Sequence, residues 1–263
     1  MQITYFWTGA ALNPYMDTMH MLLEENNNKL YIDAGWGMSL MQKILRKEIE
    51  QPRYIWITHC HSDHLLWIVH LLRIHKRWLL TILCSEEIEK KIEQLMVIVW
   101  QQKLYNKQID EKLLDYIHIN KYPQINIFDR IIKPINLLST KTEQYWFLLE
   151  QKDKRMIFFW DEAIDVLQKI DYQEMIGSDW LLCEAFCLES EKEERLPHEK
   201  NHITSQETWQ LANTLEVENL IISHINNHIS DRKKQINDIR QDASIYFKWN
   251  ICVPLDNELI HLR

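Results

Sequence analysis

The chain has 263 residues, of which 46% are apolar, and its formal net charge is −8. The length and composition fit one α/β domain with a sizeable core. The negative charge provides no basic field for nucleic acid, so any contact with RNA has to be local. The N-terminus has no basic flank followed by an apolar stretch, and no apolar run reaches the roughly 18 residues of a membrane span. We therefore expect a cytoplasmic protein without a membrane segment, in which the five scattered cysteines are reduced thiols.

Short apolar strands alternate with amphipathic helices along the chain, which is typical of one layered α/β domain over residues 1–263. Strands are predicted, in chain order, over residues 29–35, 52–58, 79–85, 145–150, 155–161, 179–186 and 219–224. Helices are predicted over residues 64–76 and 205–216, the second with Thr204 or Ser205 as its N-cap. From residue 86 to about residue 116 the apolar residues have helical spacing, which predicts a helical insertion in the domain at about 86–120.

The segment THCHSDH, residues 58–64, directly follows a predicted strand. His59 and His61 occupy alternating positions, so both side chains can face the same point, and Asp63 and His64 follow where a helix begins. Imidazole and carboxylate are zinc ligands, and catalytic zinc sites leave a position open for water. The pattern indicates such a site rather than a loop of surface histidines. A purely structural metal site is the other alternative, but such sites usually use thiolates, and Cys60 should point away from the histidines.

Together with IDAG at residues 32–35, this segment resembles the metal-binding signature of the metallo-β-lactamase superfamily. That family has an Asp at the end of a later strand and a His at the end of a still later one, and FFWDEA and LIISH supply Asp161 and His224. Glu184 in LLCEAF and His202 in NHITSQET extend the resemblance to the ribonuclease Z-like branch. The resemblance covers essentially the whole chain. It implies an α/β fold of four layers, an αβ/βα sandwich in which helices flank two mixed β-sheets.

The resemblance also implies roles for these residues. A first metal would be held by His59 and His61, a second by Asp63, His64 and His224, and Asp161 would bridge the two. The expected cofactor is Zn²⁺, as one or two ions, and Mn²⁺ or Fe also suits this mixed ligand set. Two ions that share a carboxylate activate water and clamp the attacked phosphoryl group.

Three residues are predicted to be catalytic: Asp63, Glu184 and His202. Glu184 would orient His202, which would donate a proton to the leaving alkoxide. The alternative for this pair is a helix-capping contact near Ser205.

Two positions depart from the family pattern. The third histidine of the first metal should lie in residues 135–147, where the matching position is Leu138 or at best Ser139. The first metal would then have two imidazoles, the shared carboxylate and water, so the number of metals stays open. In addition, Cys183 precedes Glu184 where the ribonuclease Z-like branch has a histidine.

The chain contains 4 Gly and 11 Trp, an unusual ratio for a fold with many turns. Where the family pattern has glycine, this sequence has Trp7, Trp36, Trp67, Trp146, Trp160 and Trp249. Glycine suits loops near metals because they need positive φ or close approach of backbone, and an indole provides neither. We hypothesise that the gene comes from a lineage that reads UGA as glycine and that the chain was translated with UGA as tryptophan.

These features predict a metal-dependent hydrolase, specifically a ribonuclease Z-like phosphodiesterase that acts on a small phosphodiester or a nucleic-acid end. Full transfer-RNA processing is not expected, because the sequence has no protruding basic arm with Gly and Pro. Two alternatives stay open: a hydrolase of esters, lactones or thioesters with the same fold, and a catalytically degenerate binding or scaffold protein. The resemblance further implies a homodimer.

Overall fold

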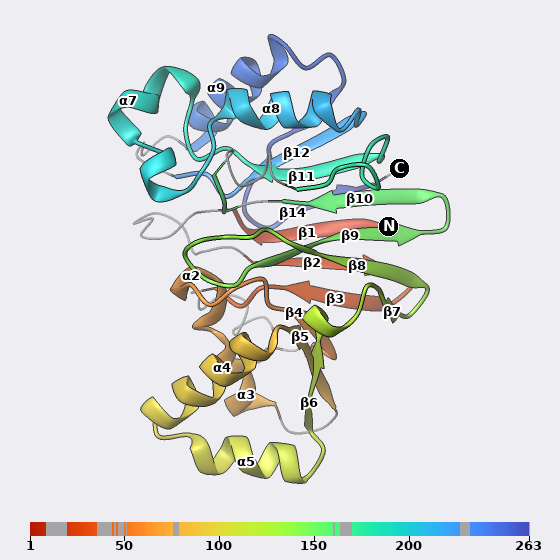
Figure 1. The fold of residues 1–263 in the computed structure, drawn as a ribbon, viewed down its shortest axis with the longest axis vertical. Coiled ribbons are helices and arrows are strands. Elements are labelled where there is room, and N and C mark those ends of the chain that lie inside the picture. Colours follow the sequence, from red (N-terminus) through yellow and green to blue (C-terminus); the bar gives the residue numbers. More distant parts are fainter. Residues whose placement is uncertain are drawn as a thin grey trace.

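The computed structural model describes residues 1–8, 20–35, 44, 46, 50, 52–75, 79–159, 161–163, 170–226 and 232–262. Two mixed sheets pack against each other, and helices cover their outer faces (Figure 1). The predicted four-layer αβ/βα sandwich is therefore confirmed.

Each sheet combines antiparallel and parallel strands. The first has the order β14 (Glu258–His261), β1 (Gln2–Trp7), β2 (His20–Glu25), β3 (Asn28–Ile32), β4 (Tyr54–Trp56), β5 (Leu80–Cys84) and β6 (Leu114–His118). The second has the order β13 (Asn250–Cys252), β12 (Asn219–Ser223), β11 (Trp180–Glu184), β10 (Lys154–Phe158), β9 (Tyr145–Gln151), β8 (Arg130–Asn136) and β7 (Ile125–Ile127).

The parallel strands position the site. β3, β4, β5 and β6 run parallel in the first sheet, as do β10, β11, β12 and β13 in the second. Because the carboxyl ends of parallel strands meet at one edge of a sheet, the residues that follow β3, β4, β10, β11 and β12 come together. The motifs singled out in the sequence lie at these strand ends.

The helices are short and mostly cap the parallel halves of the sheets. They comprise α2 (Ser62–Leu65), α3 (Ile68–Ile74), α4 (Glu86–Ile98), α5 (Gln102–Asp110), α7 (Lys192–Arg195), α8 (Ser205–Thr214) and α9 (Arg232–Ser244). α3, α4 and α5 lie against the first sheet, and α8 and α9 against the second (Figure 1). Thr204 is the N-cap of α8, and its hydroxyl and the Glu207 carboxylate satisfy each other's backbone N–H groups.

The main core fills the space between the sheets. The ring of Trp56 lies 4.7 Å from that of Phe147, which stacks on Phe158 at 4.2 Å. A second apolar cluster joins β5 to α3 and α4 through residues such as Ile82, Leu72 and Ile88. Strands buried on both faces explain the unbroken apolar runs in the sequence.

The predicted helical insertion is only partly correct. α4 and α5 occupy its first part, and the Ser85 hydroxyl caps α4 by accepting from the Ile88 N–H. The last part is strand β6, which pairs with β5 and belongs to the first sheet. β6 is so short that the spacing of its apolar residues does not distinguish a strand from a helix.

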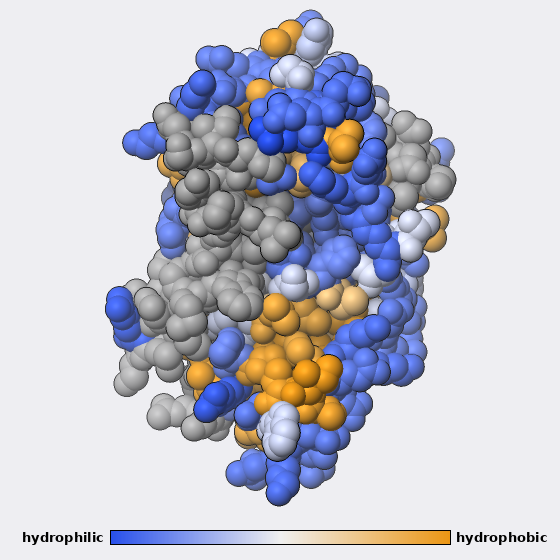
Figure 2. Space-filling view, turned by 90° about the vertical axis from the view of Figure 1, so that its left-hand side faces the viewer, coloured by the Kyte–Doolittle hydropathy of each residue, from blue (hydrophilic) through white to orange (hydrophobic). Residues whose placement is uncertain are grey.

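The end of α4 is apolar and exposed. Val97 and Ile98 are 46% and 71% exposed. Figure 2 shows an apolar area in the lower half of the face on which α4 ends. None of the helices in the described part of the chain has both the length and the hydropathy needed to cross a membrane.

The structure tests the glycine hypothesis at some of the six tryptophans. Trp36 and Trp160 lie outside the described residues, and only the backbone of Trp7 is described. Trp67 has φ −68°, its backbone N–H donates to the Ala34 carbonyl and its indole is buried. Trp146 is a fully buried residue of β9. Neither residue has positive φ, so backbone conformation gives no reason for glycine at Trp67 or Trp146, and the recoding hypothesis stays a prediction there.

A different tryptophan has the backbone conformation of a glycine. Trp100, just beyond α4, has φ 60° and is 93% exposed. Its N–H donates to the Val97 carbonyl and the Gln101 N–H to the Met96 carbonyl, the pair of bonds that defines a Schellman helix end. Glycine is the usual residue at this left-handed position, because a Cβ there costs conformational energy. α5 and α8 end with the same pair of bonds and have Lys112 and Glu216 at the left-handed position, so this conformation would favour glycine at Trp100 but does not show that a glycine was replaced.

We predict that Trp100→Gly raises the free energy of unfolding by about 1 kcal/mol, since it relieves a left-handed conformation without removing buried surface. Urea unfolding followed by circular dichroism measures this. Trp249→Gly is the matched control, because Trp249 is also exposed (61%) but has no positive φ, and this variant should show no gain. A Trp100→Gly variant no more stable than the parent would contradict the argument.

Peptide mass spectrometry of the protein from its native source tests the recoding hypothesis directly. Glycine is expected at positions 36, 67 and 160, and the helix end adds position 100. Tryptophan at these positions would refute recoding.

Candidate metal centre

The six predicted metal ligands meet at the shared sheet edge. His59 and His61 follow β4, Asp63 and His64 begin α2, Asp161 follows β10 and His224 follows β12. Nε2 of His59 lies 2.7 Å from Oδ2 of Asp161, and Nε2 of His64 lies 3.7 Å from the same oxygen. Nε2 of His224 is 3.7 Å from Oδ2 of Asp63.

Three groups of ligand atoms have all their members within 4.8 Å of one another. They are His59, His64 and Asp161; Asp63, His64 and His224; and Asp161, His202 and His224. Nδ1 of His61 lies 2.9 Å from Nε2 of His59 and 3.4 Å from Oδ2 of Asp161. Two cation positions that share Asp161 are therefore possible.

Residues at the strand ends adopt left-handed backbone conformations. The φ angles are 61° at Asp33, 64° at Asp161 and 53° at His224. Each costs of order 1 kcal/mol or more for a residue other than glycine. The turns direct these side chains into the centre from the ends of β3, β10 and β12. The strained backbone is needed for this placement.

Asp33 supports the centre, a role that the sequence analysis did not assign to it. It is fully buried, and its Oδ2 accepts from Nδ1 of His64 at 2.6 Å. Its Oδ1 accepts from the N–H and hydroxyl of Thr58 at 2.8 and 2.9 Å. Nδ1 of His59 lies 2.9 Å from the same hydroxyl, which is free to accept. Both imidazoles are thus protonated on Nδ1, and their Nε2 atoms face the other ligands. The available signal was an acid at the end of the strand before THCHSDH.

Glu184 supports two imidazoles from the other sheet. It is fully buried at the end of β11, and its Oε2 accepts from Nδ1 of His202 at 2.8 Å and from Nδ1 of His224 at 3.2 Å. Its Oε1 accepts from the Glu162 N–H at 3.1 Å. Glu184 is therefore a positioning residue. The helix-capping alternative is wrong, because Thr204 and Glu207 cap α8.

His202 is held on its face as well as at its edge. Its ring stacks on Phe186 with centroids 4.4 Å apart and planes 8° from parallel. The Lys200 ammonium lies over the Phe186 ring, 5.3 Å from its centroid. The Lys141 ammonium donates to the Lys200 carbonyl at 2.9 Å and so anchors the loop before His202. The side chain of His202 is 12% exposed, so its ring can reach a bound molecule.

Four buried carboxylates, those of Asp33, Asp63, Asp161 and Glu184, dominate the electrostatics. Burial lowers the pKa of His224, but the nearby carboxylates of Asp63 and Glu184 outweigh it and raise the pKa to about 10. Burial also lowers the pKa of His64, but the carboxylates of Asp33 and Asp63 outweigh this effect, and the pKa is raised overall. Burial lowers the pKa of His59 to about 4.

A divalent cation fits this charge and these lone pairs. Nε2 of His64 and Nε2 of His224 are buried and have no hydrogen-bond partner among the described residues. Both nitrogens turn towards Asp63, while their Nδ1 atoms are occupied by supporting carboxylates. Orphaned buried nitrogens beside carboxylates are what a metal site needs, and a cation would also offset the excess negative charge.

Several predicted neighbours contribute no ligand. Sγ of Cys60 lies 3.0 Å from the Thr142 hydroxyl, as expected for a residue that points away from the imidazoles. Cys183 is buried in β11, and burial raises the pKa of its thiol. Leu138 is 55% exposed. No third imidazole therefore joins His59 and His61 from that loop.

This four-layer sandwich, with imidazoles and carboxylates gathered at one sheet edge, is the architecture of a metal-dependent hydrolase. Residues 28–225 match the family model described as the beta-lactamase superfamily domain, so the chain belongs to the metallo-β-lactamase superfamily.

Solved structures share the fold over the full chain. The metallo-β-lactamase fold protein YhfI from Bacillus subtilis is 15% identical, with a TM-score of 0.74 and 99% of each chain covered. The short form of human tRNase Z is 16% identical, with a TM-score of 0.71 and 100% of each chain covered. A diphosphatase of the PhnP family is 13% identical, with a TM-score of 0.70 and coverage of 100% of this chain and 98% of that one. No curated protein matches the chain by sequence.

We predict that Asp33→Asn lowers the affinity for Zn²⁺ by about 10- to 100-fold, because Asn keeps only one acceptor oxygen and can no longer hold both His64 and Thr58. Competition with a chromophoric chelator measures the affinity. Asp153→Asn, a change in the exposed turn between β9 and β10, is the control for lost charge. Equal affinities in the two variants would count against a supporting role for Asp33.

Proposed function

We propose that the chain is a phosphodiesterase of ribonuclease Z-like type that acts on a small phosphodiester or a nucleic-acid end. The observation that carries the proposal is the pair formed by Glu184 and His202, whose Nδ1 lies 3.3 Å from Oδ1 of Asp161. A proton donor is thus fixed beside the ligand that both cation positions share. Such a donor suits a reaction in which an alkoxide leaves phosphorus.

The residues of the centre would hold Zn²⁺, with Mn²⁺ or Fe as possible alternatives for this ligand set. When bound, the cation supplies a lowered pKa for water and electrostatic stabilisation of the phosphoryl oxygens. Asp161 would lie between the two cation positions and contribute to both. Asp63 brings a second carboxylate to the site, next to His64 and His224.

His202 would deliver its proton from Nε2, because Nδ1 is already bonded to Glu184. The buried Glu184 carboxylate orients the imidazole, and the Phe186 ring fixes its plane. Glu184 would act only through the two imidazoles it orients.

Similar solved structures support hydrolysis and leave the substrate open. They include a tRNase Z, a diphosphatase and an isothiocyanate hydrolase, at 12–16% identity. The net charge of −8 argues against a long nucleic-acid footprint, so a compact diester is the preferred substrate. The same metal ligands could serve an ester, lactone or thioester hydrolase. The proton donor argues only against the thioester, because a thiolate leaves without a proton whereas an ester or lactone also expels an alkoxide.

We predict that His202→Ala impairs hydrolysis selectively, depending on the leaving group. A dinucleoside monophosphate, which expels an alkoxide, should be cleaved about 10²- to 10⁴-fold more slowly. Bis-p-nitrophenyl phosphate should lose far less, because p-nitrophenolate leaves without a proton. Steady-state rates of the Zn²⁺-loaded protein measure both.

His198→Ala is the matched control, since His198 lies in the same loop and bonds to Glu207 instead of the centre. Asp63→Ala should abolish cleavage of both substrates. Equal losses for the two substrates in His202→Ala would exclude the proton-donor role. Cleavage of esters or lactones without any cleavage of diesters would favour the alternative enzyme. A protein that binds no Zn²⁺ and cleaves neither class would be a binding or scaffold protein.

The expected cytoplasmic location and homodimer are further proposals. The exposed apolar end of α4 gives subunit pairing a possible surface. Sedimentation equilibrium determines whether the chain is a dimer in solution.

A further inference from the structure

The two cation positions that share Asp161 are unequal. The first is bounded by His59, His61 and Asp161, and the second by Asp63, His64, His224 and Asp161. They differ in burial and in how firmly the imidazoles are held. These two properties influence how tightly a cation binds.

The second position is fully prepared. Its imidazoles are 0% exposed, and each is oriented by a buried carboxylate, Asp33 for His64 and Glu184 for His224. The free Nε2 atoms of both face Asp63, and neither has a hydrogen-bond partner among the described residues. Ligand atoms of Asp63, His64 and His224 lie within 4.8 Å of one another, and Oδ2 of Asp161 lies 3.7 Å from Nε2 of His64, so a cation needs little rearrangement to bind here.

The first position is only half prepared. His59 is buried and oriented by Thr58, but the side chain of His61 is 36% exposed. Nδ1 of His61 faces the centre at 2.9 Å from Nε2 of His59. The two imidazoles and Asp161 make three protein ligands here, and one of them, His61, is neither buried nor oriented by a supporting carboxylate among the described residues.

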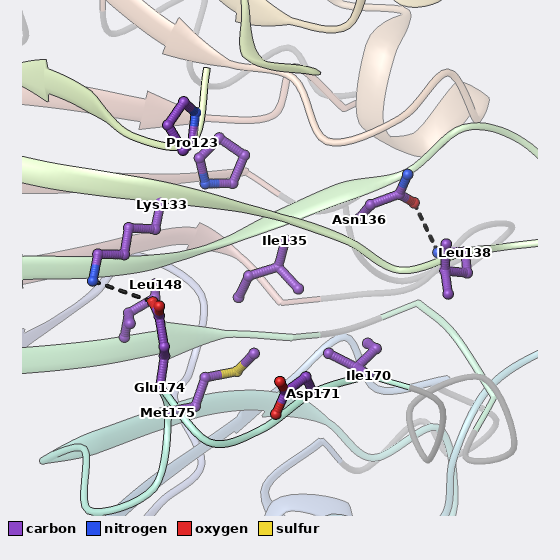
Figure 3. Close-up of a pocket in the computed structure, with 11 residues that line it drawn as sticks. Pro123, Lys133, Ile135, Asn136, Leu138, Leu148, Ile170, Asp171, Glu174 and Met175 are labelled. Atoms are coloured by element: carbon purple, nitrogen blue, oxygen red, sulfur yellow. Dashed lines mark hydrogen bonds and ion pairs between the residues drawn. The ribbon is translucent and has the colours of Figure 1, made fainter. Parts of the chain in front are cut away.

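The loop beside the first position supplies no further ligand. Leu138 lines a separate cavity of about 400 Å³ beside β8, together with Lys133, Ile135 and Met175 (Figure 3). Its N–H is fixed by the Asn136 side chain at 2.8 Å, also visible in Figure 3. The Ser139 hydroxyl accepts from the Lys141 N–H, and Glu143 belongs to none of the groups of ligand atoms found in the described residues.

We infer that the chain retains one cation tightly, at Asp63, His64, His224 and Asp161, and takes a second cation only weakly and exchangeably at His59 and His61. This rests on the proposed function, in that it assumes the centre binds a divalent metal. The weakly bound cation would then occupy the position at His59 and His61 only at high metal concentration. At low metal concentration the protein carries a single cation.

Zn²⁺ titration of the stripped protein tests the inference without using activity. Isothermal titration calorimetry should give two phases whose dissociation constants differ by about 100-fold or more. After gel filtration in metal-free buffer, atomic absorption should find one equivalent of zinc per chain. Two retained equivalents, or one phase of two equal sites, would overturn the inference while leaving the metal centre intact. Absence of any bound zinc would instead remove the proposed function itself.

A pair of imidazole variants locates the tight ion. His61→Ala should retain one equivalent after gel filtration and lose the weak phase. His224→Ala should retain none, and Asp63→Asn serves as a second probe of the same position if His224→Ala does not fold by circular dichroism. Loss of the retained equivalent in His61→Ala, or its survival in both His224→Ala and Asp63→Asn, would contradict the assignment.

Discussion

The structure depends on hydrogen bonds between buried carboxylates and the Nδ1 atoms of imidazoles. Asp33 holds His64 from the first sheet, and Glu184 holds His202 and His224 from the second. Each bond fixes a tautomer and turns the remaining nitrogen towards the shared centre. Without them, the centre would be a cluster of mobile histidines around uncompensated carboxylates. The facing sheets matter because each contributes one of these supports.

The geometry of the centre has an energetic cost that the fold absorbs. Asp33, Asp161 and His224 are left-handed residues at the ends of buried strands. A core built from strands that are apolar on both faces can hold such strain, since its packing over-determines the strand ends. Trp100 is also left-handed, but it lies at an exposed helix end, as Lys112 and Glu216 do. Only the left-handed residues at the strand ends direct side chains into the metal centre.

The inferred difference between the two cation positions has a structural basis. A ligand position occupied by Leu138 removes one imidazole from the first position, while every support of the second position is present. Phosphoryl chemistry does not require two equal ions, because a single cation beside a fixed proton donor supplies both charge stabilisation and a path for the proton. We infer one tight cation position and one weak position, not two equivalent ones.

The sequence alone determined the strand ends that carry His59, His61, Asp161 and His224, because buried parallel strands leave apolar runs and a metal motif is local. It did not separate β6 from the helices before it or detect β1 and β2, since short segments carry too little periodicity. Only the tertiary structure revealed the support by Asp33, the double role of Glu184 and the outward placement of Leu138. These depend on contacts between residues far apart in sequence and on backbone angles that no residue pattern encodes. Composition exposed the scarcity of glycine, but the left-handed conformation at Trp100 was decided by how α4 ends.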